Sequence, residues 1–131
     1  MAIRIVRLGE VRTTGEGLRM GTVRRPPRGV PKAEFASRDY YDVWYPALSP
    51  SAELVAKAQL AKGTEDGKAW RSFEKSFRAE MARPDVSRTL DLLAALSHQT
   101  SFSLGCYCED ESHCHRSILR ALLQERGAAI A

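Results

Sequence analysis

The sequence lacks a long hydrophobic run, and no apolar stretch approaches the roughly 20 residues that are needed to cross a bilayer. Arginines interrupt the apolar stretch at residues 3–8, whereas a signal peptide carries its charge before such a stretch, so we expect that the protein is not secreted. No internal repeat and no low-complexity segment is present. These absences predict a cytoplasmic protein with no membrane partner.

Cysteine is scarce, and the three that occur are Cys106, Cys108 and Cys114. An odd number of cysteines in a reducing compartment argues against a disulfide framework. All three fall within nine positions near the C-terminus, and such clustering favours metal binding, redox chemistry or a reactive thiol. The alternative is that Cys106 and Cys108 are small buried residues of a strand.

Composition indicates one globular domain that spans residues 1–131, since 44% of the residues are hydrophobic and 27% are charged. The net charge is +4, but residues 1–38 alone hold nine Arg or Lys against three Glu, which gives +6. This asymmetry favours an anionic partner, whether nucleic acid, phosphate or carboxylate, and a solvated basic face is the alternative. Nucleic acid is the weakest of these predictions, because the sequence shows no helix-turn-helix or zinc-finger motif.

Hydrophobic periodicity predicts two strands, then three helices, one strand and one helix. The strands are expected at residues 3–8, 18–23 and 101–108, and the helices at 52–61, 68–82, 86–96 and from about residue 113. Ser51 and Ser112 are the expected N-caps of the first and last helices, and Gly63 is expected to end the first. Phe77 and Met81 lie on the core face of the second helix. This order predicts an α/β fold in which helices cover a small, mostly parallel sheet.

An arginine-rich loop follows the second predicted strand. Residues 24–31 contain three prolines, which exclude a helix and a central strand, and three arginines. Sites in parallel sheets form where strands end and helices begin. We therefore expect this loop to lie near the segment that follows the last strand.

The segment at residues 106–116 concentrates reactive side chains. A cap at Ser112 would place His113, Cys114 and His115 in the first turn of the last helix, where unpaired backbone N–H groups carry partial positive charge. This environment lowers the pKa of a thiol. Cys114 is therefore the candidate nucleophile, with His113 or His115 as its proton partner. The spacing from cysteine to Arg116 does not fit the Cys-x5-Arg signature of phosphatases.

Two other kinds of chemistry fit the same segment. Cys106, Cys108 and Cys114, together with one histidine, supply ligands for zinc, although the usual Cys-x2-Cys knuckle is absent.

Anion binding is the second alternative chemistry for residues 106–116. The start of the last helix and Arg116, joined by Arg24 and Arg28 from the arginine-rich loop, would bind a phosphate or a carboxylate.

Several stretches of the chain match motifs of one known family. They are Arg24-x-x-Pro27-Arg28-Gly29-Val30-x-Lys32, the stretch from Trp44 to Ser51, and the helix that holds Trp70, Phe73 and residues 77–80. Over residues 2–126 the chain resembles the domain-of-unknown-function family 488, and within it the YeaO-like branch. Cys114-His115-Arg116 is similar to the Cys-His-Arg motif of the other branch, which also has a cysteine at the position of Cys106.

The chain departs from the YeaO-like pattern at three positions. Val23 stands where that branch usually has an aspartate, and Cys114 and His115 stand where it has asparagines. The resemblance implies an α/β fold and a site that joins the two loops. The resemblance does not imply a particular activity, because the family has no settled function.

The leading hypothesis is a small thiol-dependent enzyme, or a binding protein, for an anionic phosphate- or nucleotide-like molecule. The alternatives are a non-catalytic zinc module and a nucleic-acid-associated protein. The sequence alone does not identify the substrate, the cofactor or the oligomeric state. The leading hypothesis requires that Arg24, Arg28 and Cys114 share one cavity.

Overall fold

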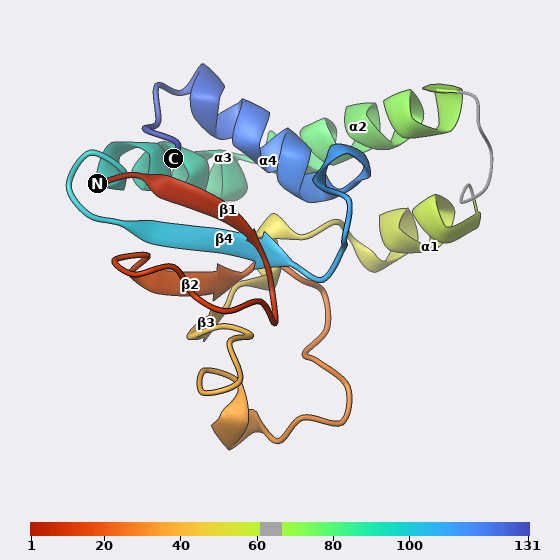
Figure 1. Ribbon diagram of the computed structural model, residues 1–131. Coiled ribbons are helices and arrows are strands. Elements are labelled where there is room, and N and C mark those ends of the chain that lie inside the picture. The colour runs from red at the N-terminus through yellow and green to blue at the C-terminus, as the bar shows by residue number, and fades with distance from the viewer. Residues whose placement is uncertain (61–66) are drawn as a thin grey trace.

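Within residues 1–60 and 67–131, which this computed structural model describes, four strands form one parallel sheet (Figure 1). They are β1 (Ile3–Arg7), β2 (Leu18–Gly21), β3 (Val43–Trp44) and β4 (Phe102–Cys106), and they lie in the order β1-β4-β2-β3. β4 pairs with both β1 and β2, and all of its residues are buried. The strand that comes last along the chain is therefore central, and it ends at Cys106.

The helices of the described residues pack against one face of this sheet. They are α1 (Ala52–Leu60), α2 (Gly67–Met81), α3 (Pro84–Leu96) and α4 (His115–Glu125). All four contribute to one apolar core, which also contains Ile3, Met20 and Leu104 from the strands. Phe77 and Met81 of α2 are buried in it, as their helical spacing predicted. The predicted class, α/β with a parallel sheet covered by helices, is confirmed.

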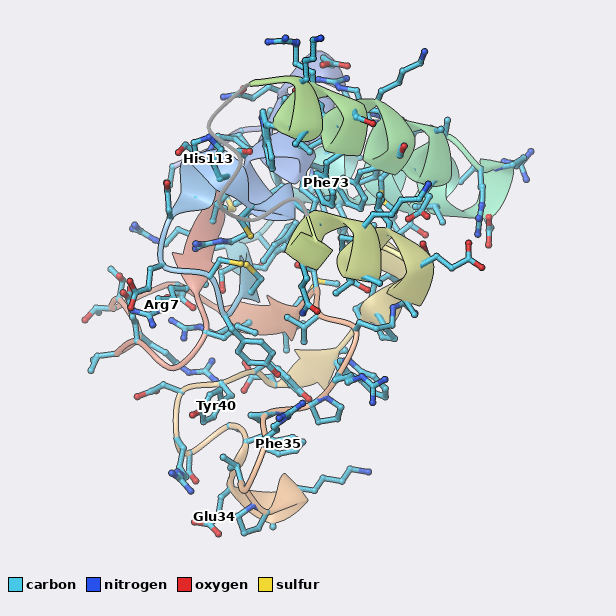
Figure 2. All side chains as sticks on the ribbon, turned by 90° about the vertical axis from the view of Figure 1, so that its right-hand side faces the viewer. Arg7, Glu34, Phe35, Tyr40, Phe73 and His113 are labelled. Carbon is cyan, nitrogen blue, oxygen red and sulfur yellow. The ribbon has the colours of Figure 1, made fainter. Side chains whose placement is uncertain are left out.

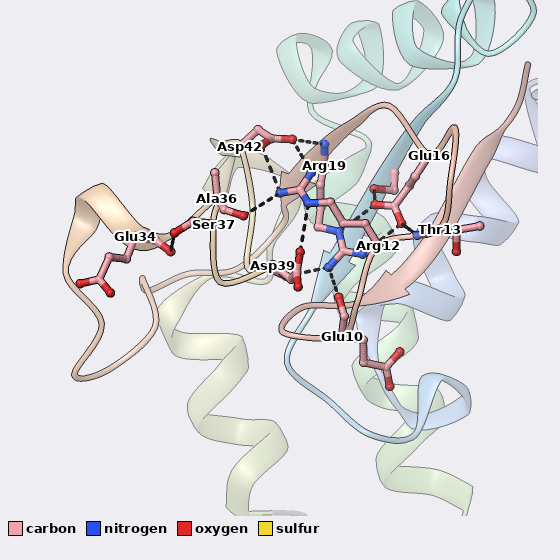
Figure 3. A network of polar contacts seen from close by, with 11 residues as sticks. Glu10, Arg12, Thr13, Glu16, Arg19, Glu34, Ala36, Ser37, Asp39 and Asp42 are labelled. Carbon is pink, nitrogen blue, oxygen red and sulfur yellow. Dashed lines mark hydrogen bonds and ion pairs between the residues drawn. The ribbon is translucent and has the colours of Figure 1, made fainter.

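The opposite face of the sheet carries a buried ion pair (Figure 3). Arg19 and Ser103 alternate with core residues of β2 and β4, so their side chains point away from the helices. The side chains of Arg19 and Glu16 are 1% and 2% exposed, and Arg19 Nε donates to Glu16 Oε2 at 2.8 Å. Arg19 also donates to the backbone carbonyls of Glu10 and Asp39. The network ties the loops on both sides of β2 to the central strand, because Ser103 Oγ donates to Glu16 at 2.7 Å.

The first helix begins where the sequence predicted, and the third begins two residues before its predicted start at Val86. Ser51 Oγ accepts a hydrogen bond from the backbone N–H of Leu54 at 3.2 Å, which is the contact of an N-cap at the start of α1. α3 begins with Pro84, whose fixed φ suits the first position of a helix. The predicted end of the first helix at Gly63 lies outside the described residues. No helix in the described part of the chain is long and apolar enough to cross a membrane.

The last helix begins later than expected, and the prediction that Ser112 caps it is wrong. Asp110 accepts hydrogen bonds from the backbone N–H and the hydroxyl of Ser112, at 3.0 and 2.6 Å. These bonds stabilise a separate 3-10 turn at Glu111–His113. α4 therefore begins only at His115, and Cys114 occupies the N-cap position in extended conformation.

Candidate functional site

A cleft of about 900 Å³ opens at the edge of the sheet where β2 and β4 end. Residues 23–28 form one side, residues 106–108 and 113–115 form another, and one face of α1 completes the wall. Figure 2 faces this side of the molecule, with Phe73 and His113 toward the helices and Tyr40 on the other side. The two loops that the sequence singled out therefore border a common space.

The arginine-rich loop contributes two exposed cations to the cleft. Arg25 and Arg28 are exposed, and no group among the described residues accepts a hydrogen bond from either side chain. Arg24 has a structural role, because its guanidinium donates to the carbonyls of Pro46, Ser49 and Pro50 at 3.0 to 3.3 Å. The charge that a ligand would meet thus comes from Arg25 and Arg28.

Arg116 does not line this cleft. It is buried, and one of its terminal nitrogens donates to the backbone carbonyl of Cys108. It faces a separate pocket of about 370 Å³, which it shares with Arg4, Arg7 and Glu111. Arg116 was predicted to bind an anion together with Arg24 and Arg28, but it lies outside the cleft that these two residues line.

A pair of buried thiols contributes to the wall of the cleft. Cys106 ends β4 and Cys114 caps α4, so the turn between them folds the chain back on itself. Their Sγ atoms are 2.7 Å apart, and the residues are only 1% and 3% exposed. Cys108 also lines the cleft but is exposed to solvent. The cluster therefore offers one accessible thiol and two protected ones.

His115 is held in one tautomer beside this pair. Its Nε2 lies 2.6 Å from the backbone oxygen of Thr22, and a carbonyl can only accept, so Nε2 carries the hydrogen. Nδ1 is left with a lone pair and faces Cys114 Sγ at 3.7 Å. Burial lowers the pKa of His115 to about 4. The ring is neutral at pH 7, so it accepts a hydrogen bond from Cys114 without forming an ion pair.

His113 lies at the rim of the cleft, where it is exposed. Its Nδ1 is 3.2 Å from Asp110 Oδ2, and its ring meets Trp70 edge to face at 5.4 Å between centroids. A carboxylate that accepts from Nδ1 leaves Nε2 of His113 free to exchange a proton with a bound molecule.

One set of side chains could also hold a metal ion. One ligand atom each of Cys106, Cys114 and His115 lies within 4.8 Å of the others. The sequence had predicted Cys106, Cys108 and Cys114 together with one histidine as ligands, and the geometry groups two of these cysteines with His115 and leaves Cys108 outside the group. The hydrogen bond from His115 to Thr22 would orient the ring, as metal-bound histidines require.

Comparison with protein-family models gives a match over most of the chain. A family model for DUF488-N3a, described as the active DUF488-N3 subclade, matches residues 3–127. The chain belongs to this family. The resemblance to family 488 that the motifs suggested is thereby confirmed. Among curated proteins and among solved structures, none matches the chain.

The thiols of this DUF488 member differ in acidity. Hydrogen bonds from Cys106 and Cys114 lower the pKa of Cys108 far below its ordinary value. Hydrogen bonds to its two neighbours, together with burial, raise the pKa of Cys106. For Cys114, the hydrogen bond with Cys106 lowers the pKa, but its hydrogen bond to Cys108 and its burial raise it more. Of the three thiols, only Cys108 has its pKa lowered.

Sequence reasoning missed two features of the DUF488 site. It expected a lowered pKa at Cys114, whereas burial beside the Cys108 sulfur raises it. It also missed Tyr107, whose hydroxyl donates to the backbone carbonyl of Arg25 at 2.9 Å and joins the two loops directly. A tyrosine between two cysteines carries no signal of such a contact, because its partner lies 82 positions away.

Proposed function

We propose that the chain is a thiol-dependent enzyme for an anionic small molecule, with Cys108 as its nucleophile. The observation that carries this proposal is the shared cleft, which joins an exposed thiol to the exposed guanidinium groups of Arg25 and Arg28. Hydrogen bonds from the two buried thiols favour the reactive thiolate form of Cys108, because they lower its pKa. The description of the matched subclade as active also supports a catalytic role.

The lining of the cleft favours an anion. Three arginines contribute to it, and no Asp or Glu of the described residues does. Its volume of about 900 Å³ is in the range of small-molecule sites. Tyr40, Phe73 and Tyr107 add aromatic surface, which suits a ligand with a planar or apolar part beside its charge.

Proton transfer is assigned to His113. It lines the cleft, it is exposed, and Asp110 orients its ring. His115 is less suited to this role, because it is buried and its pKa is lowered to about 4. In this proposal His115 positions Cys114, and His113 exchanges protons with the substrate.

Alkylation by a charged and a neutral reagent tests the proposal. Iodoacetate and iodoacetamide react with the same thiolate, so the ratio of their rates at Cys108 measures the local electrostatic potential. We expect Arg25→Gln combined with Arg28→Gln to lower that ratio about fivefold at low salt. Each charge contributes on the order of 0.5 kcal/mol at about 8 Å in water.

A matched control removes two exposed charges outside the cleft, by Lys75→Gln combined with Arg88→Gln. This variant should keep the rate ratio of the wild type. An unchanged ratio in the arginine-loop variant, or an equal fall in the control, would contradict an anion site beside Cys108.

A metal centre is the second candidate, and the cluster of Cys106, Cys114 and His115 favours it. Three protein ligands beside an open cleft would leave one position free, as in catalytic zinc sites. Titration with Zn²⁺ against a chromophoric chelator tests this. Cys106→Ser and His115→Gln should abolish tight binding, whereas Cys108→Ser should retain it. Equal binding in all variants would exclude this ligand set.

A further inference from the structure

We propose that the three cysteines form a relay that reduces disulfide bonds of anionic small molecules. This inference rests on the proposed function, because it uses the same cleft and the same nucleophile. It adds the class of reaction, which is thiol–disulfide exchange, and the class of substrate, which is a disulfide that carries carboxylates.

The division of the cluster into one accessible and two protected thiols carries the inference. An enzyme that uses a single nucleophilic thiol needs only Cys108. Here a second and a third sulfur lie behind it, and the Sγ atoms of Cys106 and Cys114 are 2.7 Å apart. A disulfide bond is about 2.05 Å long, so a small rotation of the two side chains would suffice to join them. Both residues line the same cleft as Cys108.

The backbone around the cluster is held in place. Arg7 Nε donates to the carbonyl of Tyr107 at 3.3 Å, and Arg116 donates to the carbonyl of Cys108. On the far side of the turn, Glu111 pairs with Arg120 at 2.7 Å. These contacts keep the exposed sulfur close to the buried pair.

The relay proceeds in three exchanges that balance without an outside reductant. The Cys108 thiol loses its proton and attacks the substrate disulfide R–S–S–R. A mixed disulfide forms, and the first product takes that proton and leaves as RSH. Cys114 then attacks the Cys108 sulfur, and the proton of its thiol goes to the second departing RSH. Cys106 finally attacks the Cys114 sulfur, and its proton goes to Cys108.

The net reaction converts one R–S–S–R and two protein thiols into two RSH and a disulfide between Cys106 and Cys114. Cys108 returns to its thiol form. The oxidised pair is buried, which protects it from further exchange with bulk thiols.

Oxidised glutathione, a disulfide that carries carboxylates, is the probe, and intact mass spectrometry is the readout. The reduced wild-type protein should lose two hydrogen atoms and release two equivalents of glutathione. Cleavage after Tyr107 and after Glu109 separates the three cysteines, so peptide mapping should place the disulfide between Cys106 and Cys114.

The variants stop the relay at different stages. Cys114→Ser should accumulate one glutathionyl group on Cys108, and Cys106→Ser should stop at a disulfide between Cys108 and Cys114. Cys108→Ser should release glutathione about tenfold more slowly, because the remaining thiols are buried. Far-ultraviolet circular dichroism confirms that each variant is folded, and Cys114→Ala provides a second replacement if the serine variant is not.

A wild-type protein that stays glutathionylated at Cys108 would overturn the relay while leaving the proposed nucleophile intact. If Arg25→Gln combined with Arg28→Gln leaves the ratio of the iodoacetate and iodoacetamide rates unchanged, the proposed anion site is overturned instead. A disulfide mapped to Cys106 and Cys108 would also contradict the order of exchanges. Protection of all three thiols by Zn²⁺, with no exchange in metal-free protein, would favour the metal centre and refute the relay.

Discussion

Replacing Glu16 by Gln should destabilise the protein strongly, because Glu16 is the buried partner of Arg19 on the face of the sheet opposite the helices. The substitution preserves the shape of the side chain and removes its charge. The guanidinium of Arg19 then remains buried with two carbonyl partners and no counter-ion. Ser103 loses its carboxylate acceptor as well, which loosens β4, the strand that ends at Cys106.

The magnitude follows from the acidity of Glu16. Burial by itself would raise the pKa of this carboxyl, but hydrogen bonds from Arg19 and Ser103 lower its pKa from 4.5 to about 2. At about 1.4 kcal/mol for each pKa unit, this difference corresponds to about 3 kcal/mol. Breaking a buried ion pair by removing one partner costs a similar 3–5 kcal/mol or so. We therefore expect a loss of about 3 kcal/mol at pH 7.

The sign of the pH dependence follows from the same values. The folded-state pKa is below the unfolded one, so this contribution is present above about pH 4.5 and is lost as the pH falls toward 2. Urea unfolding at several pH values measures it. The difference between wild type and Glu16→Gln should shrink in acid, and the exposed Glu34→Gln should change stability by less than about 0.5 kcal/mol. Equal stability of the two variants at pH 7 would refute the reasoning.

Three further predictions follow from the site and its supports. Burial lowers the pKa of His115 to about 4. The free energy of unfolding of the wild type should therefore fall by about 3 kcal/mol as the pH falls from about 6.5 to 4. In urea unfolding, His115→Gln should lack this pH dependence. Gly21→Ala would place a Cβ 2.3 Å from the ring of Tyr41 and should lower the free energy of unfolding by about 1–3 kcal/mol. The control Gly15→Ala meets no atom within 4 Å, so it should lower the free energy of unfolding by only about 1 kcal/mol, because of its positive φ. Thermal unfolding measures both. Alkylation of Cys108 should reach half its maximal rate well below pH 8.5, because hydrogen bonds from its two neighbours lower its pKa. A midpoint near pH 8.5, as for a free thiol, would show that those hydrogen bonds do not form.

Local patterns alone were enough to predict the four helices, three of the four strands in the described residues and the class of fold, whereas the two-residue strand β3 was not predicted. Helical spacing in residues 68–82, Pro84 as the end of that helix and the alternation in residues 101–108 are properties of short segments. Their physical causes, which are the periodicity of burial and the φ restriction of proline, act within a few residues. The same holds for the family, because its motifs are contiguous stretches of sequence.

The chemistry of the cleft was decided by contacts that form only in the folded chain, some within residues 108–115 and some between distant segments. Asp110 accepts a hydrogen bond from the backbone N–H of Ser112 in a separate turn, so Cys114 becomes the N-cap of α4. Burial beside Cys108 raises the pKa of the Cys114 thiol. The tautomer of His115 depends on the carbonyl of Thr22, 93 positions away. Burial and partner identity are properties of the packed molecule, so one-dimensional spacing could point to the reactive segment but could not assign a role to each sulfur.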